Sequence, residues 1–414
     1  SALCINAEMI GFFCVYKEEK DMLISIAFML MLGMFLGWVC RKLRLPGLMG
    51  MIFTGVLLGP YALNLIDVSI LNISSELRRI ALIIILMRAG LSLDLNDLKK
   101  VGRPAVLMCF LPACFEILGM VLLAPRLLGI SVLDAAIMGA VVGAVSPAVI
   151  VPKMLKLIED GYGTDKGIPQ LLLAGASVDD VFVIVMFTAF TGLAQGGSIS
   201  PISFVKIPVS ILIGSFIGLA AGWGLAVYFK RVHIRDTVKV IVLLCVSFIL
   251  VTLEDRYSDI VPFSSLISVM GIGIALQKKR EEAARRLSVK FNKVWVCAEI
   301  MLFVLVGATV NIHYALSAGV WAVILIFGVL VFRMAGVFCC LAGTRLNMKE
   351  RVFCMIGYMP KATVQAAIGG VPLAMGLACG DIVLTVAVLA ILITAPLGAF
   401  LIDLTYKRFL QERL

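Results

Sequence analysis

Two adjacent acidic residues lie in the middle of a long apolar segment. They are Asp179 and Asp180, in the stretch Gly-Ala-Ser-Val-Asp-Asp-Val-Phe-Val-Ile that begins at residue 175. A charged side chain inside a membrane costs at least about 2.5–3.5 kcal/mol, so it is functional or paired by default. Carboxylate oxygens are hard ligands for a small, hard cation, and the same group can hold a proton instead. Competition between the two ions for one site predicts an antiporter. The alternative is a helix cap or a buried salt-bridge network.

Five further ionisable residues lie within apolar segments, namely Arg88, Glu116, Glu299, Arg333 and Lys361. We expect Lys361 to supply positive charge near the two aspartates. Glu116 and Arg333 are interpreted as a structural ion pair, because removing one partner of a buried pair strands a charge at about 3–5 kcal/mol. Two roles stay open for Glu299, as a third carboxylate in the ion path or as the partner of Arg88. Arg88 itself lies near midspan or reaches towards the membrane surface.

The segments that carry these residues have the length and composition of transmembrane helices. Hydrophobic residues make up 61% of the 414 residues and charged residues 15%, whereas soluble domains are about 45–50% apolar and about 25% charged. About thirteen apolar blocks are each long enough to cross some 30 Å of hydrocarbon as a helix. These blocks cover residues 22–40, 46–62, 79–96, 104–124, 131–154, 168–194, 205–229, 237–253, 262–277, 294–310, 315–342, 352–375 and 381–404. The sequence therefore predicts an all-α, polytopic membrane protein.

The basic residues predict how these helices are oriented. With the linker 41–45 placed in the cytoplasm, 26 of the 36 lysines and arginines fall on the inner side and seven, including Arg78, on the outer side. Cytoplasmic loops carry the excess of positive charge, so the C-terminus is predicted to be cytoplasmic, in a plasma or inner membrane. Anionic lipid headgroups at the inner leaflet explain the net charge of +10, and no nucleic-acid partner is expected.

Thirteen helices divide into two six-helix repeats of opposite orientation around one linker helix, which is a common plan among transporters. A shift of 217 residues supports this division. It aligns Gly90-Leu-Ser-Leu-Asp with Gly307-Ala-Thr-Val-Asn, and it aligns Glu116 with Arg333. We therefore predict an inverted repeat.

Two helices in corresponding positions of these halves carry prolines and glycines that predict a break. One contains Gly-Ala-Val-Ser-Pro-Ala-Val-Ile-Val-Pro at 143–152, and the other contains two prolines within 359–372. An interior proline costs about 3 kcal/mol in a helix, and unwound backbone in a bilayer must be satisfied by protein or by a wet cavity. We expect both breaks to border the ion site. Ser146, Thr363 and Gln365 would satisfy the freed backbone groups there or provide neutral oxygen ligands.

Three motifs resemble the cation:proton antiporter superfamily. They are Asp-Asp at 179–180, Ser-Pro-Ala-Val-Ile-Val-Pro at 146–152 and Pro-Lys-Ala-Thr-Val-Gln-Ala-Ala-Ile-Gly at 360–369. The resemblance is to the sodium/proton branch that holds the mammalian NHA-type exchangers and their bacterial relatives, and it covers nearly the whole chain from about residue 22. It implies that the broken helices cross, that Asp180 binds Na⁺ or Li⁺ with Asp179 beside it, and that the protein is a homodimer.

The resemblance also implies a core that moves like an elevator against a dimerisation domain. The implied parts are an outer N-terminal segment (1–21), the dimerisation domain (22–97 and 237–312), the core (98–195 and 313–405), a linker helix (196–236) and a cytoplasmic tail (406–414). One residue departs from the family pattern. Electrogenic bacterial members carry a lysine on the helix that holds Arg333 here, so the coupling ratio stays open.

Transport of another kind remains an alternative. K⁺ could replace Na⁺, because carboxylate ligands alone do not set the size of a cation site. A sodium-coupled symporter for an organic solute would need a larger polar cavity than the few polar residues within the spans suggest, and a channel would show a filter or an acidic ring. An enzyme is not expected, since His233 and His313 lie at the ends of spans and no metal-ligand cluster is visible. No cofactor is expected either.

Overall fold

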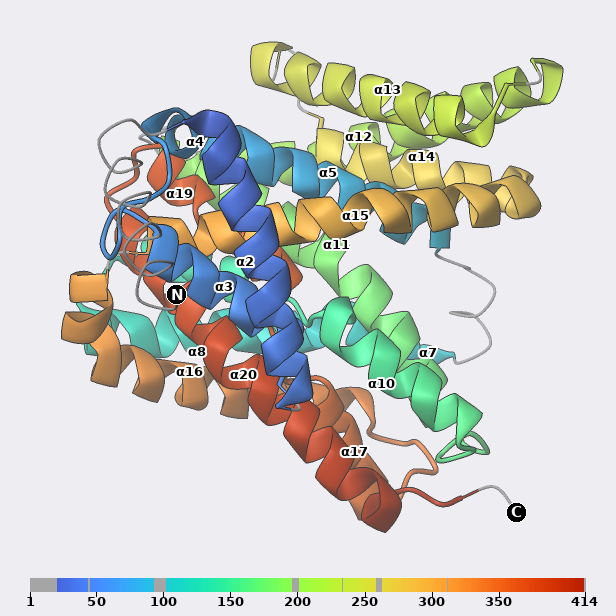
Figure 1. Ribbon diagram of the computed structural model, residues 1–414. Helices are drawn as coiled ribbons and strands as arrows, with labels where there is room; N and C mark the ends of the chain where they lie inside the picture. Colours follow the sequence, from blue (N-terminus) through green and yellow to red (C-terminus); the bar gives the residue numbers. More distant parts are fainter. Residues whose placement is uncertain are drawn as a thin grey trace, which may run out of the picture.

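The computed structural model describes residues 21–43, 45–92, 102–195, 201–232, 234–257, 263–310 and 312–412. Within these ranges the backbone forms helices and short connections, with one isolated β-bridge between Tyr162 and Glu412 (Figure 1). The all-α prediction is confirmed. The predicted outer segment 1–21, apart from Asp21, and residues 196–200 of the predicted linker lie outside the described residues.

Within the described ranges, eight helical segments are long and apolar enough to cross a membrane. They are Met22–Lys42, Arg103–Leu128, Val132–Glu159, Leu212–Arg231, Asp236–Tyr257, Glu281–Thr309, Gly319–Cys340 and Gly380–Phe409, and the shorter apolar helices are Gly47–Leu58, Phe182–Gln195 and Thr363–Ala374. The chain is therefore a multi-pass integral membrane protein. Each of the thirteen apolar blocks coincides with a helix or a broken helix. The number of crossings and the inverted repeat stay predictions.

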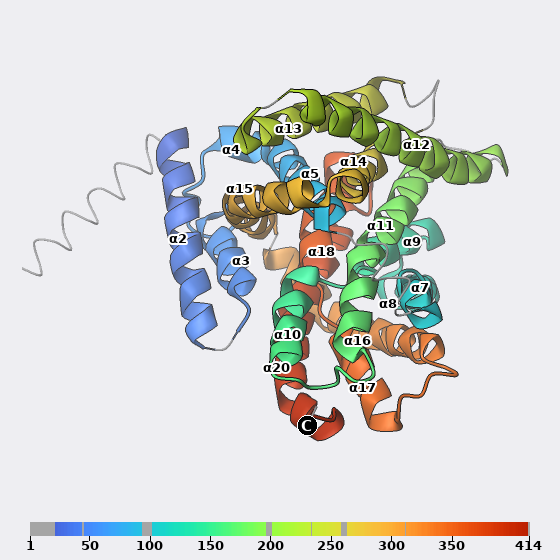
Figure 2. The same ribbon diagram turned by 90° about the vertical axis from the view of Figure 1, so that its right-hand side faces the viewer.

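The helices lie in two groups, of which the first is seen along the left side and the top of Figure 2 and the second towards the lower right. The first group consists of α2 (Met22–Lys42), α3 (Gly47–Leu58), α4 (Val68–Asn72), α5 (Ser74–Ser92), α12 (Pro201–Arg231), α13 (Asp236–Tyr257), α14 (Ser265–Lys279) and α15 (Glu281–Thr309). The second group consists of α7 (Arg103–Met108), α8 (Leu111–Leu128), α9 (Val132–Val142), α10 (Pro147–Glu159), α11 (Ile168–Gln195), α16 (Ile312–Cys340), α17 (Met348–Gly357), α18 (Thr363–Ile368), α19 (Val371–Ala374) and α20 (Gly380–Phe409). Whether they act as a dimerisation domain and a mobile core stays a prediction.

Glycines hold the first group together by allowing backbones to touch. A Cβ built on Gly55 of α3 would lie 1.9 Å from the carbonyl oxygen of Val304 in α15, and one on Gly307 of α15 would lie 2.2 Å from that of Ile52. Helices in lipid gain no hydrophobic drive from one another, so close packing of small residues is a main source of their association. Substituting either glycine would force α3 and α15 apart.

Both predicted broken helices are broken, although not at every expected residue. The first break covers residues 143–146, between α9 and α10, and the second covers residues 358–362, between α17 and α18. Pro147 stands in the first turn of α10, where its missing N–H is not needed. The break therefore ends just before both prolines of 143–152, since Pro147 begins α10 and Pro152 lies inside it.

Two further boundaries differ from the sequence prediction. The predicted single span 104–124 is interrupted between α7 and α8, because Pro112 has no N–H to bond the carbonyl of Met108. The hydroxyl of Tyr358 donates to that carbonyl instead, at 2.9 Å. At the other end, α20 continues to Phe409, past the expected boundary at residue 405. Its basic last turn, with Lys407 and Arg408, suits the C-terminus of a helix.

Candidate ion-binding site

The two breaks lie against each other inside the second group of helices. The backbone N–H of Ser146 in the first break donates to the carbonyl of Pro360 in the second, at 2.8 Å. A break leaves the helix ends on either side with unpaired N–H and C=O groups, and inside a membrane these need partners in the protein. Direct pairing of one break with the other supplies part of that need. The sequence thus brings two distant proline-containing segments to one place.

Gln365 of α18 joins the breaks a second time. Its side-chain Nε2 donates to the carbonyls of Val142 and Ala144, at 3.2 and 2.8 Å, and its Oε1 accepts from the N–H of Ala362 at 2.8 Å. In the same break, the N–H of Lys361 donates to Thr394 Oγ1 of α20 at 2.9 Å. The expectation that Gln365 satisfies freed backbone groups is met.

Four charged side chains form a buried network beside the breaks. Glu116, Asp179, Arg333 and Lys361 are each at most 1% exposed. Arg333 Nη1 donates to Glu116 Oε2 at 2.5 Å, and its Nη2 donates to Asp179 Oδ2 at 3.0 Å. Lys361 Nζ donates to the same oxygen of Glu116 at 2.5 Å. The predicted contact between Glu116 and Arg333 is therefore present.

Lys361 supplies positive charge near Asp179, as predicted. Its ammonium donates to Glu116, however, and the guanidinium of Arg333 is the cation that touches Asp179. The planar guanidinium has five N–H donors in a fixed fork, which lets Arg333 span several acceptors at once. It also donates to the carbonyl of Gly143 and, from Nε at 2.7 Å, to that of Tyr358. These two residues end α9 and α17, where the helix dipole favours a cation.

Four side-chain oxygens near this network have no hydrogen-bond partner among the described residues. They are Asp179 Oδ1, Asp180 Oδ1, Ser146 Oγ and Thr363 Oγ1, and all four residues are buried. A buried acceptor without a donor costs about 1–3 kcal/mol. Ser146 even occupies the N-cap position of α10, yet its hydroxyl makes no capping hydrogen bond. These are the four residues that the sequence analysis assigned to the ion, and hard oxygen ligands of this kind suit a small alkali cation.

The sequence that forms this site was compared with known protein families. Residues 26–406 match the family described as "Sodium/hydrogen exchanger, transmembrane", and this range contains both groups of helices and the charged network. The chain belongs to the sodium/hydrogen exchanger family.

Relatives and a solved structure agree with this family. Human sodium/hydrogen exchanger 9B2 is 34% identical over 381 residues, which cover 89% of this chain and 70% of that protein. Human sodium/hydrogen exchanger 9B1 is 31% identical over 392 residues, covering 89% and 73%. The structure of the sodium proton antiporter MjNhaP1 from Methanocaldococcus jannaschii at pH 8 superimposes with a TM-score of 0.82 over 94% of this chain and 98% of that one. At 19% identity, this last likeness shows the fold.

Arg88 and Glu299 of this exchanger-family chain lie apart from the network, on α5 and α15 of the first group. Both are partly buried, and each is the other's first electrostatic partner, with Arg41 also acting on Glu299. Of the two roles left open for Glu299, this mutual electrostatic interaction favours the partner of Arg88.

Two residues that the sequence analysis did not assign to the exchanger's interior are buried there. Tyr358 is fully buried, with its ring 5.1 Å from the guanidinium of Arg333. Arg78, which was counted among the outer charges, is only 6% exposed and packs over Gly370, between α18 and α19. Its Nε donates to the carbonyl of Ser74, and its Nη1 has no hydrogen-bond partner in the described part of the chain. No sequence signal separates Arg78 from its neighbour Arg79, which pairs with Asp255 at 2.7 Å.

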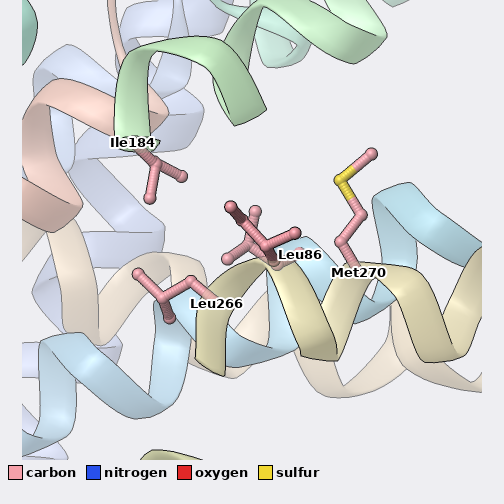
Figure 3. Close-up of a pocket in the computed structure, with 5 residues that line it drawn as sticks. Leu86, Ile184, Leu266 and Met270 are labelled. Atoms are coloured by element: carbon pink, nitrogen blue, oxygen red, sulfur yellow. The ribbon is translucent and has the colours of Figure 1, made fainter. Parts of the chain in front are cut away.

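A small apolar pocket lies where the aspartate helix of the exchanger meets the first group (Figure 3). Ile184 of α11 faces Leu86 of α5 and the α14 side chains Leu266, Ile267 and Met270. Ile184 follows Asp180 by four residues, so the two lie on the same face of α11. The face that carries the candidate site therefore continues directly into an apolar boundary between the two groups.

Proposed function

We propose that this chain exchanges Na⁺ for H⁺ across a membrane, with Asp180 as the group that takes either ion. The observation that carries this proposal is the environment of Asp180. Its carboxylate is buried next to Asp179, near the two hydrogen-bonded breaks, and its Oδ1 has no hydrogen-bond partner among the described residues. Asp179, in contrast, accepts from the N–H of Val145 at 2.8 Å and from Arg333 at 3.0 Å. Asp179 is therefore held in place while Asp180 is free to bind.

The charges of the site support a one-for-one exchange. Three buried carboxylates (Glu116, Asp179 and Asp180) face two buried cations (Arg333 and Lys361), which leaves a formal charge of minus one when all are ionised. Burying an uncompensated charge is costly, so one Na⁺ or one proton restores neutrality and the two exclude each other. A cycle that moves one Na⁺ in one direction and one proton in the other would then transfer no net charge across the membrane.

The cation would be held by oxygens alone. Asp180 Oδ1, Asp179 Oδ1, Ser146 Oγ and Thr363 Oγ1 are the buried side-chain oxygens near the charged network that have no hydrogen-bond partner among the described residues. A site made of two carboxylates and two hydroxyls combines full negative charge with neutral ligands, which suits Na⁺ or Li⁺ more closely than a soft metal ion. We therefore assign Asp179, Asp180, Ser146 and Thr363 to the ion, Lys361 and Arg333 to charge compensation, and Glu116 to holding those two cations.

Alternating access would come from movement of the second group of helices against the first, within a homodimer whose C-terminus is cytoplasmic. The hydrogen bonds and ion pairs of the site join α8, α9, α11, α16 and α18 with their breaks, so these helices would move as a unit. The pocket at Leu86, Ile184 and Met270 is apolar. Apolar contacts are non-directional, so such a boundary can shift without breaking specific bonds.

The test is cation-driven proton movement by the full chain in proteoliposomes that enclose a pH-sensitive dye. We expect a Na⁺ gradient to drive proton flux in the wild type, and Asp180→Asn to reduce the rate at least about a hundredfold because the essential charge is gone. Asp381→Asn, at the exposed start of α20, is the matched control and should keep the wild-type rate. Full exchange by Asp180→Asn would overturn the assignment of the site. A rate that changes with an imposed membrane potential would overturn the one-for-one ratio.

A further inference from the structure

Gln365 binds two backbone oxygens at the first break. Its side chain is 1% exposed, and its amide donates both to the carbonyl of Val142 and to that of Ala144. Its own oxygen is fixed by the N–H of Ala362 in the second break. We name these three hydrogen bonds the Gln365 bridge. Because Asn and Gln amides carry two donors and one acceptor oxygen, the bridge uses both ends of the amide.

With the Gln365 bridge in place, three consecutive backbone carbonyls each accept a hydrogen bond from a side chain. The carbonyl between the two that Gln365 binds belongs to Gly143, and Arg333 donates to it. Val142, Gly143 and Ala144 therefore all have side-chain donors on their carbonyl oxygens. A carbonyl with a donor bound to it is a weaker ligand for a cation. These three carbonyls are therefore less available to an ion than the four side-chain oxygens named above, which have no hydrogen-bond partner among the described residues.

Carbonyl oxygens matter because they are the ligands that replace the hydration shell of larger alkali cations. Selectivity among hard cations depends on the size of the cavity, the number of ligands and their rigidity. In K⁺-selective pores, rings of backbone carbonyls provide the coordinating oxygens. Here three neighbouring carbonyls already have side-chain donors, and hydrogen bonds join the two backbone segments. Such a site offers a larger ion fewer extra ligands and less room than one with those carbonyls free.

We propose that Gln365 is a specificity-determining residue, which excludes K⁺ from the site by keeping the carbonyls of Val142 and Ala144 occupied and the two breaks at a fixed separation. This inference rests on the proposed exchange function and adds the origin of its cation preference. Gln365 acts through the backbone and holds no ion itself.

The test compares Na⁺, Li⁺ and K⁺ at equal concentration in the proteoliposome assay with the full chain. In Gln365→Ala, both carbonyls lose their donor, and we expect the ratio of the Na⁺-driven to the K⁺-driven rate to fall at least about tenfold. Thr394→Val is the matched control, because it removes the acceptor for the N–H of Lys361 without freeing either carbonyl. Its ratio should stay at the wild-type value. Equal losses for all three cations in Gln365→Ala would overturn the inference.

A binding measurement keeps the inference separate from the exchange function and from folding. In detergent, Na⁺ and K⁺ are each titrated against the melting temperature of the purified chain, since a ligand that binds the native state raises it. Gln365→Asn retains the amide on a shorter side chain that cannot span both breaks, and it serves if the alanine variant does not fold. We expect K⁺ to stabilise the variant and not the wild type. If the wild type moved no protons, the proposed exchange function would be wrong, but the binding comparison would still measure cation selectivity. Unchanged selectivity in both variants would overturn the role of Gln365.

Discussion

Arg333 and Arg78 are both buried, with 1% and 6% of their surface exposed, but their surroundings are opposite. Arg333 has a carboxylate partner on each side, in Glu116 and Asp179, and it also donates to two carbonyls. Arg78 has one hydrogen bond, from Nε to the carbonyl of Ser74, and its Nη1 has no partner among the described residues. One arginine lies inside the second group of helices. The other reaches from α5 across the boundary to Gly370.

This difference distinguishes the charged network inside the second group of helices from the boundary between the two groups. The buried ion pairs next to the aspartates join helices of the second group to one another. At the boundary with the first group, Arg78 lies over Gly370 and apolar side chains meet at Leu86, Ile184 and Met270. Separating such a boundary breaks no charged pair of the kind that holds Arg333. On the proposed mechanism, such a contrast would let the ion site keep its shape while the side of the membrane to which it opens changes.

The largest effect is expected for Arg333→Met. The substitution leaves Glu116 sharing its charge with Lys361 alone, removes the cation from Asp179 and strands the carbonyls of Gly143 and Tyr358. Removing one partner from a buried pair costs about 3–5 kcal/mol, so the melting temperature in detergent should fall by many degrees. Arg286→Met is the control, because Arg286 is 57% exposed in its pair with Asp236, and exposed pairs contribute little. Equal melting of the two variants would remove the contrast.

A much smaller effect is expected for Arg78→Met. Methionine fills a similar volume without a charge, and a buried cation without a carboxylate partner gains nothing from its charge to offset desolvation. The free energy of unfolding should therefore fall by no more than about 1 kcal/mol, or rise. The melting temperature should accordingly stay near that of the wild type or increase. The same melting experiment gives the answer. A loss as large as that of Arg333→Met would mean that Arg78 is paired in the folded protein and that the boundary is fastened by charge.

The sequence was sufficient for the features that depend on local composition. Apolar length located the helices, prolines located both breaks, and the rarity of charge inside the spans singled out Asp179, Asp180, Glu116 and Arg333. Even the contact between Glu116 and Arg333 was suggested by the shift of 217 residues that separates them. The roles of these residues in transport stay predictions, because contacts alone do not measure them.

Features that depend on which way a side chain points were beyond the sequence. Arg78 and Arg79 are adjacent, and successive residues of a helix point about 100° apart, so one faces Gly370 while the other faces Asp255. The same limit applies to Lys361, whose acceptor among several carboxylates is decided by packing. The interruption before Pro112 was also missed, since its stabilisation comes from Tyr358, which lies 250 residues beyond Met108.

The smallest effect is expected at the surface, for Tyr162→Phe. Tyr162 lies between α10 and α11, and its hydroxyl donates to Glu412 Oε2 at 2.9 Å beside the β-bridge that joins these two residues. This hydrogen bond raises the pKa of Tyr162 above its ordinary value of 10.0. A raised folded pKa means that the bond contributes fully below the ordinary value and is lost as the pH rises through the raised one.

Cleavage near residues 410–412 by a protease that is active at alkaline pH should be slightly faster in Tyr162→Phe than in the wild type at neutral pH, and the two rates should converge as the wild-type phenol ionises. Tyr61→Phe, at an exposed position, should not change the rate. The ring contact with Tyr406, whose centroid lies 5.1 Å away, is kept by phenylalanine. A difference between Tyr162→Phe and the wild type that persisted at strongly alkaline pH would therefore contradict the assignment to this hydrogen bond, because the bond needs the phenolic proton.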